Sequence, residues 1–122
     1  MLKPGDVVWC KFPKQEGDGN LVHPGLVIGI EESVEGDLYA RVAYGSSKKV
    51  SLDGCLIFEL VISDEQDGYT FFAKTGLNRP TRFDMRVVTR LPIEMLEKIG
   101  VLDWNSFPDV RARLGKALTA AQ

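Results

Sequence analysis

The segment that most constrains the fold is a short apolar run at residues 23–30, which reads His-Pro-Gly-Leu-Val-Ile-Gly-Ile. Short apolar runs bounded by turn residues are typical of strands buried on both faces. The side chains that would be buried are those of Leu26, Val27, Ile28 and Ile30. We therefore expect a central strand here, with His23, the only histidine of the chain, at its start.

Further strands are expected on both sides of this segment. Apolar and β-branched side chains predict them at residues 5–12, 38–44, 55–62 and 82–91, and residues 69–73 fit either a short strand or an inserted turn. Residues 13–22 are rich in Pro, Gly, Asp and Asn, which predicts a mobile loop. Many strands and few helices predict a mainly β fold, a small antiparallel barrel with helices added late.

Two helical segments are expected after the last of these strands. Residues 92–99 begin with proline and are followed by Gly100, which is typical of one or two helical turns. Ser106 or Asp109 can cap a final helix with one apolar stripe. We therefore expect one domain over residues 1–122, with a barrel at about 3–91 and a helical tail at about 92–122.

Length and composition suit a globular protein of one domain. The chain has 122 residues, of which 44% are hydrophobic, and this is enough for one core. No apolar run is long enough to span a bilayer, and the first residues turn polar at once, unlike a secretory signal. We expect a cytoplasmic protein with no membrane association.

Charge and cysteine content bear on the class of partner. The net charge is −2 and the pI about 5.4, which argues against a protein that coats nucleic acid. Lysines and arginines nevertheless cluster along the chain, so a local positive groove is expected. Cys10 and Cys55 form no CxxC pair and are most simply core residues. We expect no zinc site, no other metal and no organic cofactor.

Polar residues at three strand ends suggest a phosphate-binding groove. His23 precedes the central strand, and residues 45–49 read Gly-Ser-Ser-Lys-Lys after another. In the strand at 82–91, the two-residue period places Arg82, Asp84 and Arg86 on one face. Each feature also has a plainer interpretation: a histidine bonded to the backbone, an exposed turn, and a solvated face with cross-strand ion pairs.

Four blocks of sequence, in order, resemble the PemK/MazF (Kid-like) toxins of type II toxin–antitoxin systems. They are residues 5–9 (GDVVW), 23–28 (HPGLVI), 42–48 (VAYGSSK) and 81–84 (TRFD). The resemblance implies an SH3-like barrel, a homodimer and a metal-independent, sequence-selective endoribonuclease. Such an enzyme would cleave single-stranded mRNA and be silenced by an antitoxin protein. The chain departs from the pattern at His23, where the family usually has arginine.

The resemblance also assigns roles to individual residues. It makes Arg82 and Asp84 look like the Arg-x-Asp pair that does acid–base work in the Kid-like branch, and it places Ser46 and Ser47 in the phosphate pocket. We count Ser47 with the catalytic candidates. The candidates for binding RNA phosphates are Ser46, Lys48, Lys49, Arg79 and Arg86.

The chemistry of RNA cleavage gives these side chains distinct tasks. Without a metal, the 2′-hydroxyl attacks the phosphate, which requires a base, an acid and positive charge. His23 suits either proton transfer because the ordinary pKa of histidine is near 6.5. Arg82 suits transition-state stabilisation because its pKa stays above about 12. Asp84 can orient Arg82 or act as the base, although a neighbouring arginine lowers a carboxylate pKa.

Two other functions fit the same sequence. The first is a non-catalytic SH3-like module, a degenerate relative that binds RNA or a protein, and His23 in place of arginine favours it. The second is a toxin that acts on a protein such as gyrase, as CcdB relatives do, and it would depend on the end of the C-terminal helix. Fold alone does not choose among these functions.

Overall fold

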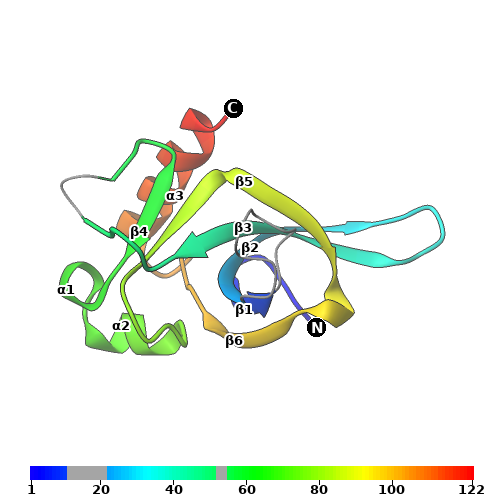
Figure 1. Cartoon of the computed structure of the whole chain (residues 1–122), viewed down its shortest axis with the longest axis horizontal. Helices are drawn as coiled ribbons and strands as arrows, with labels where there is room; N and C mark the ends of the chain where they lie inside the picture. Colours follow the sequence, from blue (N-terminus) through cyan, green and yellow to red (C-terminus); the bar gives the residue numbers. More distant parts are fainter. Residues whose placement is uncertain (11–21, 52–54) are drawn as a thin grey trace.

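The fold is a curled sheet of six antiparallel strands with helices gathered at one end (Figure 1). This computed structural model describes residues 1–10, 22–51 and 55–122. The strands are β1 (Asp6–Cys10), β2 (His23–Glu32), β3 (Leu38–Ser46), β4 (Glu59–Ile62), β5 (Thr81–Pro92) and β6 (Glu97–Val101). The helices are α1 (Asp64–Asp67), α2 (Tyr69–Lys74), the 3-10 turn η1 (Ile93–Met95) and α3 (Pro108–Ala120).

The expected mainly β fold is confirmed, and so is the C-terminal helix. The strand order is β4-β5-β3-β2-β1-β6, so the expected central strand lies inside the sheet between β3 and β1. The strand expected at 55–62 is shorter, because only Glu59–Ile62 pairs with β5. The expected loop at 13–22 lies outside the described residues except for Val22. Among the described residues, no helix is long and apolar enough to cross a membrane.

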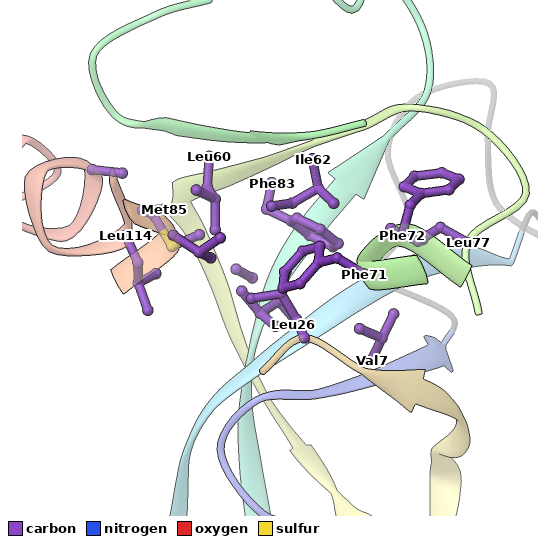
Figure 2. Close-up of a cluster of buried hydrophobic side chains, with 14 residues drawn as sticks. Val7, Leu26, Leu60, Ile62, Phe71, Phe72, Leu77, Phe83, Met85 and Leu114 are labelled. Carbon is purple, nitrogen blue, oxygen red and sulfur yellow. The ribbon is translucent and has the colours of Figure 1, made fainter. Parts of the chain in front are cut away.

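The sheet is buried on both faces, as the apolar run of β2 predicts. Leu26 and Val27 are both 0% exposed, yet they belong to two different hydrophobic clusters. Consecutive side chains of a strand point to opposite faces, so the two clusters lie on opposite sides of the sheet. Figure 2 shows the first cluster, in which Leu26 and Phe83 from strands lie with Phe71 from α2 and Leu114 from α3.

The interpretation of residues 69–73 as a strand or inserted turn is wrong, because they lie in helix α2. Ser63 starts the helical region upstream, since its side chain accepts a hydrogen bond from the Gln66 N–H. The helical turn then buries two consecutive aromatic rings, Phe71 and Phe72, in one cluster. A short aromatic run does not by itself distinguish a helix from a strand.

The helix expected at residues 92–99 is also wrong beyond its first turn. After η1 the chain forms strand β6, which pairs with β1 from Asp6↔Val101 to Trp9↔Glu97. Without β6, the backbone groups along the second edge of the buried strand β1 would lack a partner, and this tertiary demand outweighs local helix signals. The sheet therefore continues to Val101, beyond the boundary expected at residue 91, and the helical tail is α3 alone.

The segment that follows α2 crosses close to strand β6. A Cβ added at Gly100 would lie 2.3 Å from the Thr75 carbonyl carbon, and one added at Gly76 would lie 2.1 Å from the Ile99 carbonyl oxygen. Thr75 is fully buried at this point. The two glycines therefore let the backbone after α2 pass directly against β6.

We expect Gly100→Ala to lower the free energy of unfolding by about 2–3 kcal/mol, because the methyl group must displace backbone. Gly115→Ala is the matched control: its Cβ would have no neighbour within 4 Å. Alanine in an exposed helix is favoured, so this variant should gain about 0.5–1 kcal/mol. Urea unfolding of both variants measures the difference, and equal stability would contradict the crossing.

Candidate functional site

A depression of about 280 Å³ lies where the start of β2 meets the end of β3. We call it the His23 pocket. Its lining residues are Trp9, Val22, His23, Pro24, Ser46, Ser47, Lys48, Asn78 and Arg79. The pocket thus brings together five of the residues singled out from the sequence, although they come from three separate parts of the chain.

The sheet register places the histidine at this pocket. His23 begins β2 opposite Cys10 of β1, and its half-buried ring lies beside that of Tyr44 from β3, with ring centroids 4.8 Å apart. The His23 Nδ1 and the Tyr44 hydroxyl are 3.3 Å apart. When the hydroxyl accepts this bond, Nδ1 carries the proton and Nε2 is the basic nitrogen. The structure thus gives the His23 ring a side-chain contact with Tyr44.

The turn at residues 46–49 forms a second wall of the pocket. The buried Ser46 Oγ accepts a hydrogen bond from the Lys48 N–H at 3.1 Å, and Lys49 has a positive φ of 53°. A Cβ at Gly45 would lie 2.7 Å from the Pro24 carbonyl oxygen, so glycine is needed to bring β3 this close to β2. Ser47, Lys48 and Lys49 are exposed, but Lys49 is not among the lining residues.

Arg82 lies beside the pocket and is held by two groups. Its Nη1 donates to Glu59 Oε2 at 2.6 Å, and its Nε donates to the Lys48 carbonyl at 2.9 Å. Arg82 belongs to β5 and Glu59 to β4, so this is a cross-strand ion pair of the kind that the plainer interpretation proposed. The guanidinium therefore links Glu59 of β4 to the 46–49 turn.

Asp84 has a different partner. It is buried and accepts hydrogen bonds from the Arg86 backbone N–H at 2.8 Å and from the Arg86 guanidinium at 3.4 Å. The Arg86 guanidinium also lies 3.4 Å from the centre of the Phe58 ring. The structure thus places Arg82 and Asp84 on neighbouring positions but in separate ion pairs, and neither they nor Arg86 line the His23 pocket.

Sequence reasoning missed Glu59 and the role of Tyr44. Glu59 is the only charged residue in the apolar run 55–62, and a lone charge in such a run is a signal of a buried, paired side chain. The contact of Tyr44 with His23 depends on the pairing of β3 with β2, which adjacent residues do not indicate. Asn78 gives no signal, because only the path of the loop after α2 brings it to the pocket.

Cys10 lies opposite His23 in the pairing of β1 with β2. Its thiol points at the His23 carbonyl oxygen, with a sulfur–oxygen distance of 3.7 Å. Burial raises the pKa of the Cys10 thiol from its ordinary value of 9.0 to about 12. Within residues 1–10, 22–51 and 55–122, no group of three or more His, Cys, Asp or Glu side chains is placed to hold a metal ion.

Comparison with known proteins identifies the fold. No family model matches the chain, and no curated protein sequence matches it. The solved Mycobacterium tuberculosis toxin MazF-mt6 is similar, with a TM-score of 0.61 and 20% identity over 95% of this chain and 94% of that one. A second structure, of an Mtb toxin, is similar with a TM-score of 0.55 and 19% identity over 82% and 92%. The chain therefore has the MazF-like toxin fold, and the resemblance seen in the sequence is confirmed at this level.

We expect the two cysteines to differ in reactivity. Cys10 is buried as expected and its thiol stays protonated, whereas Cys55 is exposed, so its interpretation as a core residue is wrong. Ellman's reagent at pH 8 should therefore titrate one thiol in native protein and two in urea. Two fast thiols in the native state would contradict the burial of Cys10.

The raised pKa of Cys10 also predicts a pH dependence of stability. The folded state holds this proton more tightly than the unfolded state, so the contribution is complete below pH 9 and is lost as the pH rises toward 12. Cys10→Ala should remove this part of the alkaline loss. Urea unfolding of both proteins between pH 8 and pH 10.5 measures it, and parallel curves would count against the assignment.

Proposed function

We propose, on the premise of the MazF-like fold, that this protein is a metal-independent, sequence-selective endoribonuclease that cleaves single-stranded mRNA and is neutralised by an antitoxin protein. The observation that carries the proposal is the His23 pocket. It combines the one histidine with hydroxyl groups and two cationic side chains at the ends of neighbouring strands. These are the groups that RNA cleavage by the 2′-hydroxyl requires.

The pocket suits a phosphodiester group. Lys48 and Arg79 supply positive charge at its exposed rim, and the Ser46 and Ser47 hydroxyls can donate to phosphate oxygens. Trp9 adds an aromatic surface that can stack an unpaired base. The charge is local, so it is compatible with the net charge of −2.

In the proposed reaction, His23 acts on the 2′-hydroxyl. Its Nε2 takes the proton as the 2′-oxygen attacks phosphorus, and a water molecule gives a proton to the 5′-oxygen as its bond to phosphorus breaks. The products are a 2′,3′-cyclic phosphate and a 5′-hydroxyl. The contact with Tyr44 orients the ring, and the tautomer that this step uses is the one in which Nδ1 donates to the Tyr44 hydroxyl. Histidine is suited to this task because its ordinary pKa lies near neutral pH.

In this proposal Arg82 and Asp84 do not act as the acid–base pair that the family resemblance implies. The Glu59 carboxylate balances the charge of Arg82, so the charge at the phosphate would come mainly from Lys48 and Arg79. The ion pair with Arg86 occupies the Asp84 carboxylate. Base catalysis is therefore assigned to His23, and Arg82 remains the candidate for supporting the phosphorane from the edge of the pocket.

The partners follow from the same proposal. RNA is the substrate, which places the protein in the cytoplasm, and an antitoxin would silence it by covering the pocket. The resemblance to PemK/MazF toxins further suggests a homodimer.

A second function has its own supporting observation. Arg82 and Asp84, the expected acid–base pair, are each engaged by a separate partner. A protein with this arrangement could bind RNA at the His23 pocket without cutting it. The alternative is therefore a non-catalytic RNA-binding module on the same fold.

We expect the purified protein to cleave a long single-stranded RNA in EDTA and to leave cyclic phosphate ends. His23→Ala should lower the rate about 10²- to 10⁴-fold, the usual worth of a general base. Lys48→Ala should weaken binding with a smaller loss of maximal rate. Lys116→Ala, an exposed charge on α3, is the matched control and should cleave normally.

A 2′-deoxy-substituted oligonucleotide lacks the attacking hydroxyl, so it measures binding without cleavage. If the protein binds this oligonucleotide tightly, loses that binding in Lys48→Ala and leaves ordinary RNA whole, the binding module is supported and the nuclease is excluded. Failure both to cleave and to bind would overturn both proposals.

A further inference from the structure

Glu59 is a buried carboxylate that the proposed mechanism does not use. Its side chain is only 4% exposed, and both of its oxygens accept hydrogen bonds. Oε1 accepts from the Leu56 N–H at 2.9 Å, and Oε2 accepts from Arg82 Nη1 at 2.6 Å. Burying a carboxylate is costly unless it is paired and hydrogen-bonded in this way.

The sheet register explains why these two side chains meet. Glu59 of β4 lies opposite Asp84, and Val61 lies opposite Arg82. Glu59 and Arg82 are therefore diagonal neighbours on one face of an antiparallel pair, a spacing that long side chains bridge. The turn before β4 also fixes the Glu59 backbone, because the Glu59 N–H donates to the Leu56 carbonyl at 2.9 Å.

Arg82 transmits this anchoring to the His23 pocket. While Nη1 is held by Glu59, Nε donates to the carbonyl of Lys48, which is 34 positions away in the chain. The Lys48 N–H in turn donates to Ser46 Oγ. The planar guanidinium has fixed donor directions, so an anchored guanidinium also fixes where the Lys48 carbonyl lies. One connected path thus runs from β4 to the wall of the pocket.

A competing carboxylate makes the anchor necessary. Asp84 shares a strand face with Arg82 and is already bonded to Arg86. Without Glu59, Asp84 would offer Arg82 another buried carboxylate on that face, and a shift toward Asp84 would draw the guanidinium away from Lys48. Glu59 therefore decides which group Arg82 binds.

We infer that Glu59 is a positioning residue: through Arg82 it holds the 46–49 turn in the geometry that binds the substrate phosphate. This inference rests on the proposed function for its effect on RNA, but the arrangement of the turn can be measured separately. The turn carries Ser46, Ser47 and Lys48, which are three of the lining residues of the His23 pocket.

The test compares Glu59→Ala and Glu59→Gln with Glu65→Ala, which removes an exposed glutamate of α1. In ¹⁵N–¹H spectra, Glu59→Ala should shift the amide signals of residues 46–49. Glu59→Gln should shift them less, because its amide oxygen still accepts from Arg82. Glu65→Ala should leave them in place. Unchanged signals in Glu59→Ala would overturn the inference.

RNA cleavage provides the functional readout. Glu59→Ala should lower kcat/KM about 10- to 100-fold, a loss expected for a displaced binding group. The loss should appear mainly as a higher KM, because the turn would hold phosphate in both the ground state and the transition state. Glu59→Gln should recover most of it. A fall in kcat alone, matched to the unfolded fraction seen by circular dichroism, would mean that Glu59 is only structural.

The two readouts separate failure of the inference from failure of the proposed function. If wild-type protein neither cleaves nor binds RNA, the proposed function fails, and the amide shifts still decide whether Glu59 positions the turn. If wild type cleaves RNA and Glu59→Ala cleaves with unchanged KM and unchanged amide signals, the function stands and the inference fails.

Discussion

The structure depends on strand β2 being buried on both faces. Leu26 and Val27 are adjacent in the chain and are fully buried in opposite clusters, so β2 needs apolar partners above and below the sheet. Strand side chains fill one side, and α2 and α3 supply much of the other. Because a slip of one residue would exchange the two faces, this double burial also restricts the register of the neighbouring strands.

That register assembles the candidate site. With β2 fixed between β1 and β3, His23 comes next to Tyr44, and Gly45 allows the end of β3 to approach Pro24. The remaining wall comes from the loop after α2, which is tied down where Gly76 crosses β6. The site therefore has one half made by the sheet and a second half made by the loop after α2.

Two arginine–carboxylate ion pairs lie near the site. Glu59 holds Arg82 and Asp84 holds Arg86, so two arginines and two buried carboxylates form separate units on neighbouring strands. Such pairs offset the cost of burying the carboxylates. They also direct the arginines toward defined groups: Arg82 toward the Lys48 carbonyl and Arg86 toward the face of the Phe58 ring.

The sequence by itself determined the mainly β class, the central strand, the C-terminal helix and the MazF-like fold. Apolar periodicity and local blocks such as residues 23–28 and 42–48 depend only on residues that are close together in the chain. The sequence also singled out His23, Ser46, Ser47, Lys48 and Arg79, which the structure brings to one pocket. Only the tertiary structure decided that residues 97–101 form a strand, that Phe71 and Phe72 lie on a helix, and that Arg82 pairs with Glu59 rather than Asp84. The reason is physical: each of these outcomes depends on a partner far away in the chain, and local propensity carries no information about which distant edge or carboxylate that partner will be.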